Sequence, residues 1–132
     1  MLGLDVAFVG EIIRKMEYHS VPGVGRKVVG IASLRGRIVT IFDLFEVFDL
    51  PKGNSRGKDI CIILKPGINY QDIVGFFVDR VEDIIEIDDN MIERAAKKDN
   101  IWAVKKIVKL AKGVIPLIDT EDIIDFLAKN TD

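Results

Sequence analysis

Two short apolar runs separated by a polar turn dominate the hydrophobic pattern in the first half of the chain. The runs Val28–Leu34 and Ile38–Phe42 are rich in β-branched residues and have the length of strands. Between them stands the pair Arg35-Gly36, and glycine adopts a positive φ without steric cost. The pattern therefore predicts a β-hairpin with Arg35 and Gly36 at its turn.

Asp43 follows this hairpin and is placed to cap a short helix. Its carboxylate can accept hydrogen bonds from the free N–H groups of the first helical turn, and Glu46 stands three residues further on, as in a capping box. Leu44, Val47 and Phe48 would give this helix one apolar side. The predicted order is strand, Arg-Gly turn, strand, Asp cap and short helix.

The same order of elements returns later in the sequence. Three pairs of segments match, the first two at a shift of 76 positions and the third at a shift of 72: Ile31–Leu34 with Ile107–Leu110, Ile38–Asp43 with Val114–Asp119, and Val9–Ile13 with Val81–Ile85. We infer one domain of residues 1–132 built from two related halves, roughly 1–52 and 59–129, whose strands are interleaved.

The remaining elements follow from alternation and spacing. Leu4–Phe8 alternates like a strand, and we expect Val9–Met16 to be a bent strand although its apolar residues have helical spacing. Strands are also expected at Asp59–Leu64 and Asp72–Arg80, and a last helix at Glu121–Lys129 with Asp119 or Thr120 as its cap. Many short strands with few helices indicate an all-β fold.

The repeat also predicts a gap at the start of the chain. In the second half, the strand beginning near Gln71 is preceded by its hairpin partner Asp59–Leu64, whereas no segment precedes Leu4–Phe8 to act in the same way. The pattern therefore lacks a first strand, and we expect the edge that it would cover to be open. An open edge favours pairing with another chain, so self-association by strand exchange or edge pairing is expected as an option.

Composition narrows the class of protein. The chain has 132 residues, is 48% hydrophobic and 30% charged, and so predicts a globular domain. Its apolar runs are too short to cross a bilayer and no signal peptide is recognisable, so we expect a cytoplasmic protein without membrane insertion. Net charge −2 and few aromatic residues argue against a nucleic-acid partner.

No constellation for catalysis, metal binding or cofactor binding is recognisable. His19 is the single histidine and stands in a polar stretch before a proline loop, which is typical of a solvated residue. Cys61 lies in an apolar run, as a core residue does, and excludes an internal disulfide because it is the single cysteine. The glycines of Val21–Arg26 precede a strand, which disfavours a phosphate loop. We therefore expect no enzyme, no cofactor and no metal.

The chain is instead expected to act through its surface. Arg35-Gly36 is replaced by Ala111-Lys112 in the second half, so the turn itself does not require arginine, and Arg35 is the first candidate for a role beyond folding. The alternative is a solvated arginine beside a turn glycine. Trp102 fits either a core or an interface. A basic region is either a solvated face or a docking surface for an acidic partner; it comprises Lys97, Lys98, Lys105, Lys106, Lys109 and Lys112.

Several motifs in order resemble one family. They are Val21-Pro22-Gly23, Val29-Gly30-Ile31, Leu34-Arg35-Gly36 and Asp43-Leu44, followed by Val74–Asp79 and Leu117–Asp119. This series resembles the CheW family of bacterial chemotaxis coupling proteins and covers nearly the whole chain. One departure is that the family begins with a strand before the equivalent of Leu4.

The resemblance implies two five-stranded, SH3-like β-barrels and a non-catalytic scaffold. Such proteins bind the cytoplasmic tips of methyl-accepting chemoreceptors and the regulatory domain of the histidine kinase CheA. Arg35, Gly36, Glu11 and Val9 match positions that lie at or near the receptor-binding groove in the family. Two alternatives stay open, a small-molecule-binding β-barrel sensor and a detached regulatory domain of a CheA-type kinase.

Overall fold

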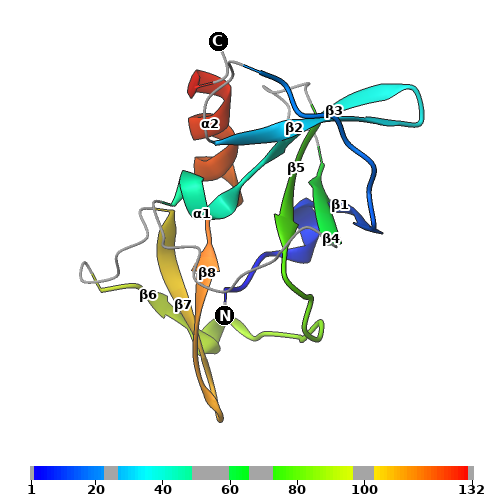
Figure 1. Cartoon of the computed structure of the whole chain (residues 1–132). Coiled ribbons are helices and arrows are strands. Elements are labelled where there is room, and N and C mark those ends of the chain that lie inside the picture. Colours follow the sequence, from blue (N-terminus) through cyan, green and yellow to red (C-terminus); the bar gives the residue numbers. More distant parts are fainter. Residues whose placement is uncertain (1, 23–26, 49–59, 66–72, 97–102, 131–132) are drawn as a thin grey trace. The chain divides into compact units, whose positions relative to one another are not determined.

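The computed structural model describes residues 2–22, 27–48, 60–65, 73–96 and 103–130 (Figure 1). These residues form mostly β-strands with a few short helices, which confirms the predicted all-β fold class. The chain divides into two compact units, which we call the central unit (residues 9–82) and the terminal unit (residues 2–8 with 83–130). The inferred repeat halves, 1–52 and 59–129, stay a prediction.

The central unit is built on a five-stranded sheet with the strand order β1-β4-β5-β3-β2. Neighbouring strands are antiparallel except for β3 and β5, which are parallel. The strands span Val9–Arg14 (β1), Val28–Leu34 (β2), Arg37–Phe42 (β3), Ile60–Leu64 (β4) and Ile73–Val78 (β5). The two segments expected as Asp59–Leu64 and Asp72–Arg80 are therefore strands, with Asp59 and Asp72 outside the described residues.

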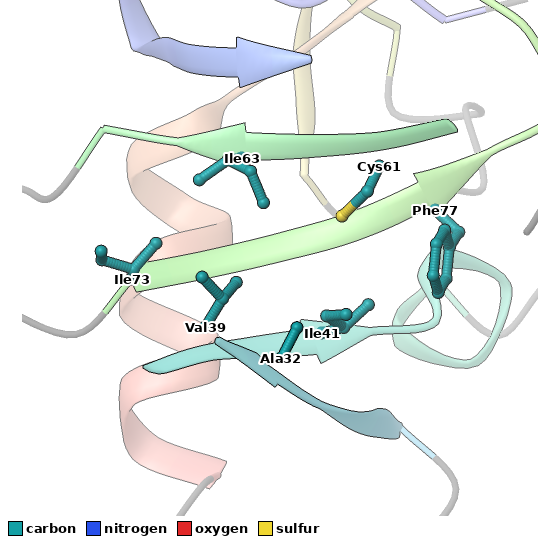
Figure 2. Packing of buried hydrophobic residues seen from close by; sticks show 7 residues of the cluster. All are labelled: Ala32, Val39, Ile41, Cys61, Ile63, Ile73 and Phe77. Atoms are coloured by element: carbon teal, nitrogen blue, oxygen red, sulfur yellow. The ribbon is translucent and has the colours of Figure 1, made fainter. Parts of the chain in front are cut away.

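One hydrophobic cluster fills the centre of this sheet (Figure 2). The edge residues Ile13 of β1 and Leu34 of β2 pack against the same cluster, so the sheet curls and its two edge strands share one core. Cys61 is buried there as predicted, and burial raises the pKa of its thiol to about 12. The cluster consists of Ala32, Val39, Ile41, Cys61, Ile63, Ile73 and Phe77.

The hairpin that the hydrophobic pattern predicted is present. Leu34 pairs with Arg37, and the two residues between them both have positive φ, 51° at Arg35 and 78° at Gly36. Positive φ at both central positions is the geometry of a type I′ turn, whose twist matches that of the flanking strands. The helix α1 (Leu44–Val47) follows, and Asp43 caps it by accepting a 2.9 Å hydrogen bond from the Phe45 N–H.

The terminal unit has a three-stranded antiparallel sheet in the order β6-β7-β8. Asp119 accepts a 3.1 Å hydrogen bond from the Asp122 N–H, which makes Asp119 the cap of the last helix. Asp122 also pairs with Lys105 at 2.8 Å, and this hydrogen bond raises the pKa of the lysine. The elements are η1 (Val6–Phe8), η2 (Asp89–Met91), β6 (Ile92–Arg94), β7 (Val104–Leu110), β8 (Gly113–Ile118) and α2 (Thr120–Asn130).

The prediction of a strand at Leu4–Phe8 is wrong. Its second half is the short helix η1, because Asp5 accepts the Ala7 N–H on its side chain at 2.9 Å and the Phe8 N–H on its carbonyl at 3.0 Å. These local hydrogen bonds close a turn that alternation alone does not reveal. Upstream of it, Gly3 forms a parallel bridge with Leu117 of β8.

The strand predicted at Val9–Met16 is confirmed as β1, and it is irregular as expected. Its register with β4 shifts between Val9 and Glu11, so Gly10 is an extra residue in a bulge. The strand ends at Arg14, and Lys15 has a φ of 52°. The matching segment Val81–Ile85 forms no strand.

Several expectations concern residues outside those that the structure describes. They are Trp102, Lys97, Lys98, the glycine loop from Gly23 to Arg26 and the loop from Leu50 to Lys58.

Candidate partner-binding site

The most specific polar contact of the central unit joins Arg35 to Glu11. The Arg35 Nη1 and Nη2 atoms donate to the Glu11 Oε2 and Oε1 atoms at 2.8 Å and 2.6 Å. Arg35 lies in the turn after β2, and Glu11 lies on β1, at the opposite edge of the sheet. Two parallel, charge-assisted hydrogen bonds fix the guanidinium plane and link the two edges of the curled sheet.

This ion pair lies at the surface. The side chain of Arg35 is 74% exposed and that of Glu11 is 29% exposed. Exposed ion pairs contribute at most about 1 kcal/mol to stability, because water screens the charges and ordering two long side chains costs entropy. The pair thus contributes little to the stability of the fold, and the guanidinium remains accessible to another molecule.

Backbone geometry positions both partners of the pair. The positive φ of Arg35 and Gly36 turns the chain so that the arginine projects from the hairpin, and Gly36 has open space on its Cβ side. Conformation and not crowding therefore favours glycine there. On β1, the bulge at Gly10 sets the direction of Glu11, because it offsets the pairing of Val9 and Glu11 with β4.

The four predicted site residues fall in two places of one unit. Arg35 and Glu11 are in contact, Gly36 is next to Arg35 in the turn, and Val9 is half-buried at the start of the strand that carries Glu11. Their assignment to partner binding stays a prediction.

An exposed apolar residue beside the turn was missed by sequence reasoning. Ile38 is 68% exposed, although it stands in an apolar run that reads as a buried strand. It pairs with Ser33 across the hairpin, one position from the fully buried Val39. Strict alternation from Val39 and Ile41 predicts the outward direction of Ile38, and that signal was available in the sequence.

The backbone of His19 pairs with Ile31 of β2 in the central unit. Its backbone N–H donates to Ile31 at 2.8 Å, and its carbonyl accepts from the Ile31 N–H at 2.9 Å. A Cβ on the neighbouring Gly30 would overlap the His19 carbonyl, so this close approach requires glycine. Among the described residues, no group of three or more His, Cys, Asp or Glu side chains is placed to hold a metal ion.

The described part of the chain also contains no helix of the length and apolarity needed to cross a membrane.

Residues 1–128 match the CheW-like domain family. The chain belongs to this family. The resemblance drawn from the Leu34-Arg35-Gly36 and Asp43-Leu44 motifs is thereby confirmed.

Two curated relatives are named chemotaxis protein CheW. The protein from Bacillus subtilis (strain 168) is 32% identical over 126 residues, which cover 92% of this chain and 78% of the relative. The protein from Thermotoga maritima is 27% identical over 125 residues, which cover 94% of this chain and 80% of the relative.

A solved structure has the same fold. The crystal structure of the scaffolding protein TtCheW from Thermoanaerobacter tengcongensis superimposes with a TM-score of 0.77 at 29% sequence identity, over 89% of this chain and 80% of the other. Together with family membership, this likeness supports a scaffold or adaptor role in chemotaxis and is consistent with a non-enzymatic protein. The small-molecule sensor and the detached kinase domain are not favoured.

Proposed function

We propose that this CheW-like chain couples methyl-accepting chemoreceptors to the regulatory domain of the histidine kinase CheA, in the cytoplasm at membrane receptor arrays. It acts by binding both partners and performs no catalysis. Membership of the CheW-like family supports the scaffold role. The observation that carries the site is the exposed, bidentate Arg35–Glu11 pair, which joins the β2–β3 turn to β1 in the central unit.

The receptor side of this proposal uses Arg35, Gly36, Glu11 and Val9. Arg35 has N–H groups that Glu11 does not engage, and these can donate to a carboxylate or amide on the helical tip of a receptor. Glu11 fixes the guanidinium plane, so the direction of these N–H groups is set before the partner arrives. Gly36 leaves room for a close approach, and Val9 supplies an apolar contact beside the polar ones.

The test compares two arginines of the same hairpin. Arg35→Ala should reduce affinity for a chemoreceptor cytoplasmic fragment by at least about tenfold, since a hydrogen bond from a charged group is worth about 1.5–3 kcal/mol. Arg37→Ala, two residues away on the exposed start of β3, is the matched control and should bind like the unchanged protein. Isothermal titration against the receptor fragment and, separately, against the CheA regulatory domain measures the affinity of each variant for each partner.

Each outcome decides one part of the proposal. Loss of receptor binding in Arg35→Ala, with kinase binding kept, supports both the coupling role and the site. Equal receptor affinity of the two variants would overturn the site, and absence of binding to either partner by a folded sample would overturn the coupling role.

A further inference from the structure

Val114, the second residue of β8, is an apolar residue that the fold leaves exposed. It is 54% exposed. Ile38, the second residue of β3, matches it at the shift of 76 positions and is 68% exposed. Because β3 lies between β2 and β5 in its sheet, lack of a neighbouring strand does not account for the exposure of Ile38. Both hairpins therefore present a β-branched residue to solvent just after the turn.

The pairing of β7 with β8 shows which residues surround Val114. Lys109 lies directly opposite Val114, and Ile107 lies opposite Pro116. Residues that face each other across a strand pair, or that are two positions apart in one strand, share one side of the sheet. Val108 points to the other side and is 1% exposed. The solvent-facing side of the hairpin and its turn form a surface that we call the tip patch, which comprises Ile107, Lys109, Lys112, Val114 and Pro116.

The tip patch is accessible because β6 covers only part of β7. The three residues of β6 pair with β7 no further than Val108, so the hairpin continues past them (Figure 1). Ile107 and Pro116 are half-buried and form an apolar base beside the exposed Val114. A partner can therefore cover Val114 without displacing any described strand.

Two lysines place positive charge close to Val114. The Lys109 Nζ atom lies 3.0 Å from the Glu93 Oε1 atom, and the two side chains are 55% and 52% exposed. An ammonium group has three N–H donors, so this contact leaves others available. Lys112 is exposed in the turn, and within the described ranges no carboxylate pairs with it. The tip patch thus combines one exposed apolar side chain with donors for anionic groups.

Strand propensity offers a simpler reason for a valine at this position. β-branched side chains fit the pleated surface of a strand, even where the strand is exposed. Threonine has the same branching and nearly the same size as valine, and it differs by a hydroxyl group in place of a methyl group. The substitution Val114→Thr therefore separates a role in forming the strand from a role in contacting an apolar partner.

We propose that the tip patch binds an acidic segment of another polypeptide, in which carboxylates flank one apolar side chain. The apolar side chain covers Val114 and the base formed by Ile107 and Pro116, and the carboxylates accept hydrogen bonds from Lys109 and Lys112. The contact is small and its charges are exposed, so the association is weak and decreases as salt is added.

The charge of the chain favours a narrow acidic segment over a broad anionic surface. Acidic residues outnumber basic ones, and the net charge of the chain is −2. An anionic bilayer or a nucleic acid extends far beyond the tip patch and interacts with the negative charge of the rest of the chain, which opposes its approach. A segment of a few residues interacts mainly with the two lysines, because salt screens charges further away.

The test is a titration of the full chain with the synthetic peptide Glu-Asp-Leu-Glu-Asp, acetylated and amidated so that only its side chains are charged. Nuclear magnetic resonance follows the backbone amides. Saturable shifts are expected between residues 107 and 115, with a dissociation constant in the millimolar range. The neutral peptide Gln-Asn-Leu-Gln-Asn keeps the leucine and should bind at least about fivefold more weakly, because it lacks the carboxylates.

Two substitutions with matched controls locate the binding. Val114→Thr should weaken peptide binding about threefold because an apolar contact is lost, whereas Ile38→Thr at the matching position of the central unit should leave the shifts between residues 107 and 115 unchanged. Lys112→Gln should weaken binding about threefold at low salt and less at high salt. Lys106→Gln, on the opposite side of the same hairpin, should have a smaller effect.

Three results would overturn the proposal. They are absence of saturable shifts between residues 107 and 115, equal affinity for the charged and the neutral peptide, and binding of these residues to vesicles of phosphatidylserine without binding of the peptide. The last would assign the tip patch to a lipid surface. Neither the receptor nor the kinase takes part in these measurements, and the proposed receptor-binding residues lie in the central unit, so the outcome is independent of the proposed coupling function.

Discussion

The β2–β3 and β7–β8 hairpins have the same order of elements but different turn geometries and different surfaces. Both central residues of the first turn have positive φ, whereas in the β7–β8 hairpin only Gly113 does. Each has a two-residue turn, since Leu34 pairs with Arg37 and Leu110 with Gly113, and each leads through an Asp cap into a helix. The first turn carries Arg35-Gly36 and an ion pair to β1, whereas the second carries Ala111-Lys112. A hairpin at the matching place in the chain therefore forms without arginine, and this difference makes Arg35 the candidate for recognition.

The largest difference in stability between substitutions in the two hairpins is expected at Ile41 and Leu117, which match at the shift of 76 positions. Ile41 of β3 is fully buried in the cluster of the central unit, whereas Leu117 of β8 is half-buried. Ile41→Ala should lower the free energy of unfolding by about 2–5 kcal/mol, and Leu117→Ala by distinctly less, because less of its side chain leaves water on folding. Urea denaturation of both variants measures this, and equal losses would contradict the stated difference in packing.

Gly3 and Gly75, which are 72 positions apart like the matching segments Val9–Ile13 and Val81–Ile85, provide the next comparison. A Cβ on Gly75 would lie 2.8 Å from Ile63 Cδ1 and 3.1 Å from Cys61 Sγ, whereas on Gly3 the nearest atom would be 3.2 Å away. Gly75→Ala should cost about 1–3 kcal/mol through overpacking, and Gly3→Ala less. Thermal unfolding of the two variants, beside the unchanged protein, tests this order; a larger loss at Gly3 would show that the two strand positions are not packed as described.

The two caps should contribute similarly in spite of different helix lengths. Asp43 and Asp119 each accept a hydrogen bond from a backbone N–H near the start of the following helix. Alanine at either position should lower stability by about 1 kcal/mol, while asparagine, which keeps an acceptor oxygen, should restore most of it. Circular dichroism during denaturation follows both. An asparagine variant no better than alanine would indicate that charge and not capping is the source of the effect.

The turns themselves should show the smallest effect on folding. Arg35→Ala should change the free energy of unfolding by less than about 1 kcal/mol, because its ion pair is exposed, and Lys112→Ala should change it by no more. Chemical denaturation under low and high salt measures both. A large, salt-independent loss at Arg35 would mean that the pair to Glu11 is a structural clasp, and it would then have to be separated from any loss of receptor binding.

Local sequence patterns predicted the hairpin well because its signals are local. The positive φ at Gly36, the cap at Asp43 and the strand alternation around Val39 each depend on a few neighbouring residues. The pattern failed at Leu4–Phe8, where the turn around Asp5 replaces a strand, and it did not anticipate the exposure of Ile38. At Leu4–Phe8 local hydrogen bonds replaced the strand, which apolar spacing does not record, whereas the alternation around Val39 and Ile41 did contain the signal for the exposure of Ile38.

The residues of the candidate site were predictable from the sequence, whereas the contact between them was not. The residues Arg35, Gly36, Glu11 and Val9 came from motifs, and the contrast with Ala111-Lys112 already indicated that Arg35 is dispensable for the turn. The contact of Arg35 with Glu11 joins positions 24 residues apart, one in the turn after β2 and one on β1, at opposite edges of a sheet. No local pattern contains that distance, because it depends on how the sheet curls around its core.

The amino-acid order thus specified which segments become strands, where the chain turns and which residues are candidates for recognition, since these depend on side-chain volume and backbone preference over short distances. The tertiary structure decided which strands are neighbours. It placed β4 and β5 from one part of the chain between β1 and β3 from another, and it paired Gly3 with β8. Strand neighbours are chosen by burial of apolar surface summed over the whole sheet, and that sum exists only when distant segments have come together.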